Sequence, residues 1–330
     1  MCLGPRQAQW AEKVCGRLPD CPHFHVVFTV PEELHGFSEA NYRIASDVLF
    51  AAAAETLANF QKNNWGVAGG FLAVEHTWGS ALHWHPHLHV LVGAGGGDLK
   101  TGRWKQARPD YLFPVRNMSA VYRAIFLRML EALEGREGVQ WPEGLPSVEA
   151  RRDWRLRLAG RNWNIFSRPT LGNTRSVVRY LARYTSRIAI SNARITGVDE
   201  EARMVSFEWK DYRNGGHKKN MTLTGGELLR RFTRHLVPKG FRRVRYFGLL
   251  AGKACRHREI PGAPRREIRG SQPEEPRARR CCPRCGESKW LHLLFLHPNA
   301  EKEGEIRTRM QEIGEPSARF SLLPSRASPR

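Results

Sequence analysis

Residues 85–92, with the sequence HPHLHVLV, decide the fold of this chain. Histidines alternate with other residues, and in an extended strand residues two apart point to the same face of the sheet. His87 and His89 therefore project together on one face, while the aliphatic residues that alternate with them cover the other. The pattern predicts a buried strand that presents two imidazoles side by side.

Two imidazoles on one strand can hold a single cation if a third group closes the site. The third group should come from a neighbouring strand, and residues 69–77 (GGFLAVEHT) are the predicted neighbour. Glu75 and His76 stand on opposite faces of that strand. The sequence does not give the register between the two strands, so both residues remain candidates.

The two ends of the histidine strand carry further signals. Pro86 cannot donate to a strand ladder, so His83 and His85 are expected in the loop that approaches the strand. Gly93 and the glycine run 95–97 lack the following helix that a dinucleotide-binding loop requires, and they are expected to end the strand in a turn.

The elements around this strand indicate an α+β domain. Residues 24–30 (FHVVFTV) read as a buried strand, and alanine-rich residues 38–60 read as a helix, which gives the order strand, helix, strand, strand. Further helices are predicted over 120–133, 174–188 and 226–236, and further strands over 202–210, 218–223 and 242–247.

Residues 174–188 (TRSVVRYLARYTSRI) form the second chemically distinctive stretch. Tyr180 and Tyr184 are four residues apart, so a helix presents them on one face. Taken alone, such a pair is an ordinary packing stripe. A phenol can attack a phosphodiester when a metal polarises the phosphate and cations hold the backbone. The same helix carries a neighbouring stripe of arginines: Arg175, Arg179, Arg183 and Arg187.

The charge of the chain points to a polyanionic partner. There are 53 Lys and Arg against 32 Asp and Glu, a formal surplus of +21 with a pI of about 10.3. Nucleic acid is the commonest partner of such proteins because neutralised phosphates release counterions. Hydrophobic residues make up 41%, which excludes wholesale disorder. No apolar run long enough to span a membrane and no secretory signal are apparent, so a cytoplasmic protein is expected.

Several basic and aromatic residues are secondary candidates for nucleic-acid contacts. Trp154 and Trp163, interleaved with arginines, either stack unpaired bases or belong to the core, and the sequence does not separate these readings. The pairs 218–219 (Lys-Lys) and 230–231 (Arg-Arg) are expected to face DNA, although a solvated surface is the default for such pairs.

The last part of the chain differs in composition. Beyond about Cys255, Arg, Pro, Glu and Ser dominate, which predicts a disordered basic tail. Disulfides are improbable in a cytosolic chain, so the seven cysteines are read as thiols or metal ligands. Cys282 and Cys285 form a single CxxC, a weak candidate for a zinc site.

The two distinctive stretches together resemble a known family. HPHLHVLV followed by RYLARYTSRIAISN (179–192) resembles the HUH endonuclease superfamily, named for its His-hydrophobic-His motif. More closely, the chain is similar to the two-tyrosine transposases of rolling-circle insertion sequences. PHFHVVFTVPEEL (22–34), EHTWG (75–79) and the tract 205–251 fit that family too, so the resemblance covers about residues 2–251.

The resemblance implies a mechanism. Two nucleophiles, Tyr180 and Tyr184, would each form a 5′-phosphotyrosine bond with nicked single-stranded DNA and release a free 3′-OH. The bond energy is kept in the covalent link, so no nucleotide cofactor is required, which agrees with the absence of a GxxxxGK[ST] loop. The implied ligands of a divalent ion, Mg²⁺ or Mn²⁺, are His87, His89 and His76, with Glu75 as the alternative third ligand.

The resemblance also implies a domain plan. An antiparallel sheet of about five strands, with the histidine strand central and helices on its sides, would form the catalytic domain over 23–250. Residues 1–22, with Cys2 as a last ligand, would be the remnant of an N-terminal zinc ribbon, and 251–330 the basic tail. DNA contacts are expected from Arg175, Arg179, Arg183, Arg187, Lys218 and Lys219. The DNA partners would be the ends of a mobile element and a target strand, at the bacterial nucleoid.

The sequence is also compatible with three other functions. A plasmid replication initiator or relaxase would use the same chemistry. A non-catalytic or decayed nucleic-acid-binding protein would keep the charge and lose the reaction. A metal-dependent hydrolase of small molecules would leave the surplus of +21 unexplained.

Overall fold

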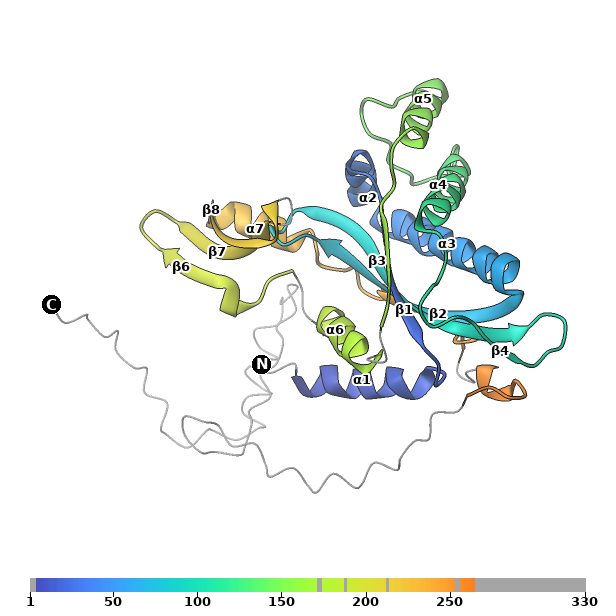
Figure 1. Cartoon of the computed structure of the whole chain (residues 1–330). Helices are drawn as coiled ribbons and strands as arrows, with labels where there is room; N and C mark the ends of the chain where they lie inside the picture. The colour runs from blue at the N-terminus through green and yellow to red at the C-terminus, as the bar shows by residue number, and fades with distance from the viewer. Residues whose placement is uncertain (1–3, 171–173, 187–188, 212–213, 253–255, 265–330) are drawn as a thin grey trace, which may run out of the picture. The chain divides into compact units, whose positions relative to one another are not determined.

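The computed structural model describes residues 4–170, 174–186, 189–211, 214–252 and 256–264 (Figure 1). The tail 265–330, with the predicted zinc candidates Cys282 and Cys285, lies outside these residues, as do Cys2 and Arg187. Within the described part, no helix is long and apolar enough to cross a membrane.

A six-stranded antiparallel sheet forms the centre of the domain, and with the helices around it confirms the predicted α+β class. Its strand order is β5-β1-β3-β2-β9, with the histidine strand β3 in the middle, and the short β4 pairs with the far end of β3. The strands are β1 (His23–Thr29), β2 (Val67–Trp78), β3 (Trp84–Asp98), β4 (Trp104–Gln106), β5 (Ile165–Pro169) and β9 (Val244–Gly248).

One face of this sheet is covered by four helices (Figure 1). They are α2 (His35–Ala40), α3 (Tyr42–Phe60), α4 (Val115–Glu131) and α5 (Val148–Ala159), and a short helical turn, η1 (Glu32–Leu34), leads into them. Phe24, Phe28 and Leu88 of the strands are among the core residues on this side, each at most 1% exposed. Burial of such side chains is the main term that stabilises the layer.

The predicted helix 38–60 is divided in two. Asn41 separates α2 from α3 with a non-helical backbone (φ −116°, ψ 44°), and its side-chain amide donates to the carbonyls of Phe37 and Gln140. Beyond α3 a single π-helical turn, η2 (Gln61–Trp65), ends at Gly66, whose φ of 67° suits glycine. Asn41, with its non-helical backbone and its hydrogen bonds to Phe37 and Gln140, therefore marks a boundary that the alanine-rich pattern hides.

Two helices cover part of the opposite face. They are α1 (Gly4–Arg17), which the sequence did not predict, and α6 (Thr174–Ser186), which corresponds to the predicted tyrosine helix as far as residue 186. Val14 of α1, Leu181 of α6 and Leu91 of β3 are fully buried in a second, smaller core.

A second sheet extends the domain beyond the β2–β3 turn (Figure 1). It has the order β6-β7-β8 and is followed by α7; a short 3₁₀ turn, η3 (Asn192–Arg194), precedes it, and another, η5 (Arg256–Glu259), follows β9. The elements are β6 (Ile195–Asp199), β7 (Met204–Asp211), β8 (His217–Thr224) and α7 (Gly225–Thr233). The predicted strands 202–210, 218–223 and 242–247 and the helix 226–236 correspond to β7, β8, β9 and α7, with shifted ends.

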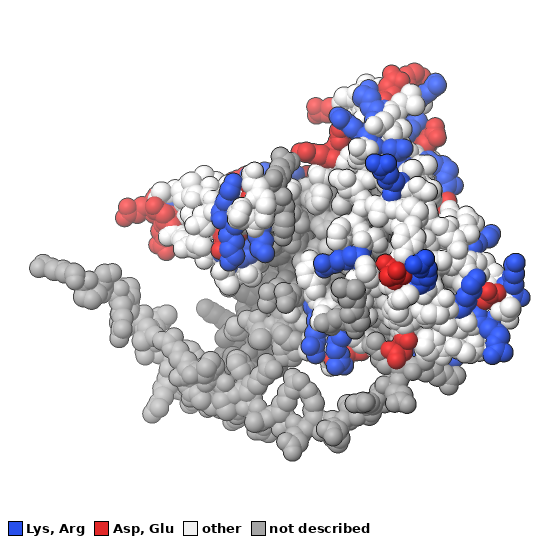
Figure 2. All heavy atoms as spheres, in the orientation of Figure 1, with Lys and Arg blue, Asp and Glu red and all other residues white. Residues whose placement is uncertain are grey.

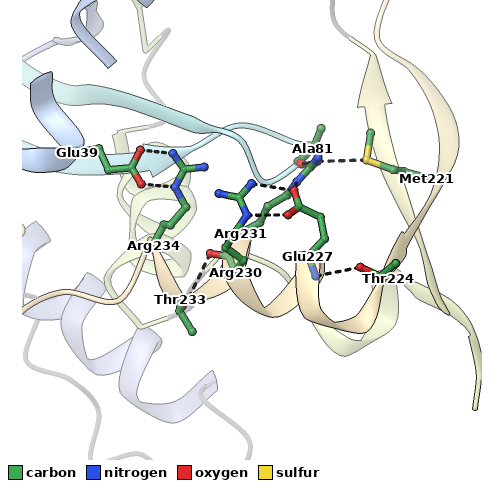
Figure 3. A network of polar contacts seen from close by, with 9 residues as sticks. All are labelled: Glu39, Ala81, Met221, Thr224, Glu227, Arg230, Arg231, Thr233 and Arg234. Carbon is green, nitrogen blue, oxygen red and sulfur yellow. Dashed lines mark hydrogen bonds and ion pairs between the residues drawn. The ribbon is translucent and has the colours of Figure 1, made fainter. Parts of the chain in front are cut away.

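Ion pairs hold α7 in place (Figure 3). Arg230 and Arg231, predicted to face DNA, both donate to Glu227 of the same helix, and Arg231 also donates to the carbonyl of Ala81 in the β2–β3 turn. Arg234 pairs with Glu39 of α2 through both carboxylate oxygens. Arg231 thus connects α7 to the β2–β3 turn and Arg234, just after α7, connects its end to α2, whereas the pair of Arg230 stays within the helix.

The ends of β3 differ from the prediction. No turn forms at the glycines: β3 continues to Asp98, and a Cβ added to Gly96 would lie 2.3 Å from the carbonyl oxygen of Ala68 on β2, so close strand approach requires glycine there. At the other end His85 lies inside the strand, because a register shift between His76 and Trp78 accommodates the proline that follows it.

Both tryptophans of the arginine-rich stretch belong to the core. Trp154 on α5 is 7% exposed and Trp163 is 3% exposed, and the Trp163 indole donates to the carbonyl of Leu158. Base stacking by these two side chains is therefore excluded, because no ring face is open to a base.

Candidate metal and nucleophile site

The register between β2 and β3 brings three imidazoles together. His76 lies directly opposite His87, and His89 follows on the same face of the sheet. The potential ligand atoms of His76, His87 and His89 all lie within 4.8 Å of one another. The ring centroids are 4.7 to 5.1 Å apart. A cation between these rings could contact all three.

Glu75, the alternative third ligand, points to the other face of the sheet. Its carboxylate is 2% exposed, and the Ser46 hydroxyl of α3 donates to its Oε1 at 2.5 Å. Burial raises the pKa of Glu75 to about 7, although Ser46, Arg245 and Arg243 oppose the rise. The structure therefore leaves Glu75 out of the imidazole cluster.

The imidazoles of the cluster are in the form that binds metals. Burial lowers the pKa of His87 to about 4. Burial and the neighbouring rings hold the pKa values of His76 and His89 well below the usual range. All three rings are neutral at pH 7, so each has one nitrogen lone pair to offer a cation. The residues present fit a divalent metal ion.

Hydrogen bonds set the orientation of two of these rings. Nδ1 of His87 lies 2.7 Å from the carbonyl oxygen of His85, and because a carbonyl only accepts, Nδ1 carries the proton and Nε2 keeps its lone pair. Nδ1 of His89 lies 3.0 Å from Nε2 of His25 on β1. A proton on His89 Nδ1 would likewise leave Nε2 of His89 for the metal.

His25 is a site residue that the sequence reasoning missed. It is 5% exposed and stacks on His89 with ring centroids 5.2 Å apart. Burial, aided by the charge of Arg168, lowers the pKa of His25 to about 4. The available signal was a histidine in place of an aliphatic residue within the predicted strand 24–30.

Tyr180 of α6 lies beside the imidazole cluster. Its ring centroid is 5.9 Å from that of His89 and 6.3 Å from that of His25, and 37% of the residue is exposed. The helix thus presents a phenol to solvent at the edge of the cluster. The side chains of Arg183 and Tyr184 lie outside what the structure describes. The role of Tyr184 as the second nucleophile therefore stays a prediction.

An open groove runs over the cluster and past Tyr180. Its walls come from the end of β1, the β2–β3 turn, the segment that enters the second sheet and the end of β7. Besides the histidines and Tyr180, the polar residues that border it include Thr29, Asn164, Ser80, Arg194 and Lys210. Its open shape suits an extended ligand.

The predicted DNA-binding residues whose side chains the structure describes do not border this groove: Arg175, Arg179, Lys218 and Lys219. Arg175 pairs with Glu12 of α1 at 2.7 Å, and Arg179 is exposed. Lys218 and Lys219 pair with acidic side chains of β7, Glu208 at 3.0 Å and Asp211 at 2.7 Å. The exposed pairs are weak, whereas the pair of Lys219 has a buried partner in Asp211. The DNA contacts of these residues stay a prediction.

The positive charge is spread over the domain. Figure 2 shows Lys and Arg over several elements with Asp and Glu interspersed. Residues 265–330 hold fourteen Lys and Arg against nine Asp and Glu, so most of the surplus of +21 belongs to residues 1–264. The folded domain, more than the tail, therefore supplies the attraction to polyanions that the composition indicates.

The antiparallel sheet, its histidine cluster and the neighbouring tyrosine of α6 together form the candidate site of an α+β protein. The chain belongs to a family of transposases: residues 70–258, which include the cluster and Tyr180, match the Y2_Tnp family model, described as "Putative transposase". The family resemblance noted in the sequence is thereby confirmed.

Two relatives extend the match over most of the chain. "Putative transposase y4qJ" of Sinorhizobium fredii (strain NBRC 101917 / NGR234) is 37% identical over 280 residues, 83% of this chain and 69% of the relative. "Transposase for insertion sequence element IS801" of Pseudomonas savastanoi pv. phaseolicola is 34% identical over 252 residues, 75% of this chain and 58% of that protein. The chain is thus shorter than both relatives.

Proposed function

We propose that this chain nicks and rejoins single-stranded DNA through a 5′-phosphotyrosine intermediate and so drives transposition of the rolling-circle type. Tyr180 is the nucleophile, and His76, His87 and His89 hold a divalent ion. The observation that carries the proposal is the placement of the exposed Tyr180 ring beside His89, at the edge of an open groove.

The reaction follows from this placement. The Tyr180 hydroxyl loses its proton and its oxygen attacks the phosphorus of a strand lying in the groove. The new bond joins that oxygen to phosphorus, the bond to the 3′ oxygen breaks, and the departing 3′ oxygen takes up a proton. A bound divalent ion would withdraw charge from the phosphate oxygens. The phosphodiester energy is kept, so a free 3′-OH can reverse the step.

The donor set favours one ion over another. Three neutral imidazoles without a carboxylate suit a transition-metal ion better than Mg²⁺, which prefers oxygen ligands. Of the two ions that the family resemblance implies, Mn²⁺ is the better match to this cluster. Tyr184, one helical turn beyond Tyr180, is the proposed second nucleophile that would let a donor and a target strand be processed together.

A covalent-adduct assay tests the proposal. The protein is incubated with Mn²⁺ and labelled single-stranded oligonucleotides from the DNA that flanks its gene, and SDS-stable adducts are separated by electrophoresis. The wild type should form an adduct, and the double variant Tyr180→Phe/Tyr184→Phe and the variant His87→Ala should not. Tyr111→Phe is the matched control, because Tyr111 is 49% exposed and does not border the groove.

The outcomes separate the competing functions. Binding of the oligonucleotides by the wild type without an adduct would overturn the enzymatic proposal and leave a nucleic-acid-binding protein. An adduct that survives in the double tyrosine variant would show a different nucleophile.

A further inference from the structure

The edge strand β5 carries an exposed aromatic side chain on the catalytic face of the sheet. Ile165 points into the core and is 8% exposed, whereas its neighbour Phe166 points the other way and is 52% exposed. Solvent-facing positions of an edge strand are usually polar. A phenylalanine at such a position loses the benefit of burial, so packing does not explain it.

The register places Phe166 in line with the imidazole cluster. Phe166 lies opposite Val27 of β1, and Val27 lies opposite His89 of β3, so these three residues share one face. Two strand spacings separate Phe166 from His89, about 10 Å. Asn164, two residues before Phe166, borders the same groove as Tyr180. Phe166 itself does not line the groove, but it lies beside this end of it, on the face of the sheet that carries the imidazole cluster.

A cation accompanies the aromatic ring. Arg168, also exposed, lies two residues further along β5, opposite His25, and its guanidinium carbon is 5.8 Å from the centre of the Phe166 ring. A single exposed apolar residue is ordinary. An aromatic ring beside a guanidinium, on the face that holds the nucleophile, is the combination by which proteins hold unpaired nucleotides.

We infer that Phe166 stacks an unpaired base of the DNA strand that is cleaved, and that Arg168 neutralises a neighbouring phosphate. The inference rests on the proposed function, because it gives the strand in the groove a path past Tyr180 onto β5. It also supplies a reason for acting on single strands. In a duplex each base is already stacked and paired, so the Phe166 ring has no free base to receive.

Equilibrium binding tests the inference without requiring cleavage. The probe is the adduct-forming oligonucleotide of the preceding assay, or any flank oligonucleotide that binds, labelled with fluorescein and measured by anisotropy in the Tyr180→Phe background with EDTA. Phe166→Ala should weaken single-strand binding by about 5- to 150-fold, the range for one stacked base. Phe166→Trp, which keeps an aromatic ring, should bind the single strand as tightly as the parent. Binding of the matched duplex should not change in either variant.

Arg168 has its own readout. The slope of log affinity against log salt should become shallower by about 0.7 in Arg168→Ala, the value for one phosphate contact on a single strand. Arg168→Lys should keep the slope, and Phe166→Ala should keep it too. A merely structural role for either residue would not separate the salt slope from the affinity in this way.

The remaining outcomes overturn the inference. The first is an affinity of Phe166→Ala within about twofold of the parent, which is the effect of a neutral surface substitution. The second is an equal loss of affinity for single strand and duplex. The third is a loss of single-strand affinity in Phe166→Trp. Tyr111→Ala, which removes a comparably exposed aromatic, controls for non-specific effects. An adduct-forming wild type with a normally binding Phe166→Ala defeats this inference alone. A wild type that binds but forms no adduct defeats the proposed function alone.

Discussion

Glu75 and His76 are neighbours on β2, equally buried, and face opposite sides of the sheet. Glu75 enters the core under α3, where Ser46 is its hydrogen-bond donor. His76 enters a cluster of imidazoles beside the groove. Loss of water favours the neutral form of both side chains. Neutrality makes the carboxyl a poor ligand and the imidazole a good one, so one physical effect gives the two faces opposite capacities.

Substitution of one residue on each face tests this difference most directly. His76→Ala should lower the rate of adduct formation by about 1,000-fold, because a lost metal ligand withdraws several kcal/mol of transition-state stabilisation. Glu75→Gln should keep the rate within about threefold, as a near-isosteric change away from the groove. The measurement is the adduct assay with Mn²⁺. An equal loss of the adduct-formation rate in both variants would show that the reaction depends on both faces of the sheet.

The second prediction concerns pH and the core face. Glu75 ionises near 4.5 when unfolded and near 7 when folded. Between these values the folded protein holds more protons, so its free energy of unfolding falls as pH rises. Relative to wild type, Glu75→Gln should therefore gain about 3 kcal/mol between pH 4.5 and pH 7.5. Urea unfolding at the two pH values measures the gain. A difference between variant and wild type that stays constant with pH would contradict it.

The third prediction concerns the support of the cluster. His25→Ala should weaken Mn²⁺ binding by about 10- to 100-fold, because the hydrogen bond that orients His89 is lost. Electron paramagnetic resonance of free Mn²⁺ measures the affinity without DNA. His217→Ala is the control, since His217 is exposed and lies on β8. Unchanged affinity in His25→Ala would make the contact between the two rings one of packing only.

The smallest expected effect comes from the partner of Glu75. Ser46→Ala removes the hydroxyl that donates to the buried carboxyl, and the free energy of unfolding should fall by about 1 kcal/mol. Adduct formation should be unaffected, since Ser46 faces the core side of the sheet. Denaturant unfolding at pH 6 measures the change. A slower formation of the adduct by Ser46→Ala that is still fully folded would show that the core face affects the reaction.

The sequence predicted the elements whose periodicity is strict. The alternation in HPHLHVLV gave the central strand and the common face of His87 and His89, and helical spacing gave α6 with Tyr180 on it. It did not choose between Glu75 and His76, because that choice depends on pairing between strands, which a single strand does not encode. The ladder from β2 to β3 supplied the missing information.

Other residues of the site depend on contacts between distant segments. His25 comes within reach of His89 only because β1 pairs with β3, and Phe166 shares the face of His89 only because β5 pairs with β1. The stripe of arginines on α6 suggested DNA contacts, yet Arg175 pairs with Glu12 of a helix that was not foreseen. Local pattern fixes which face a side chain takes, whereas tertiary pairing fixes what it meets there.

The cluster of imidazoles comes entirely from one β-hairpin, since His76 lies on β2 and the other two rings on β3. Closing a short loop costs little chain entropy, so this hairpin can assemble early in folding. Tyr180, the proposed nucleophile, comes from a helix about ninety residues later in the chain, which requires closing a longer loop. On the proposed function, a nascent chain would therefore assemble its metal ligands before its nucleophile reaches them.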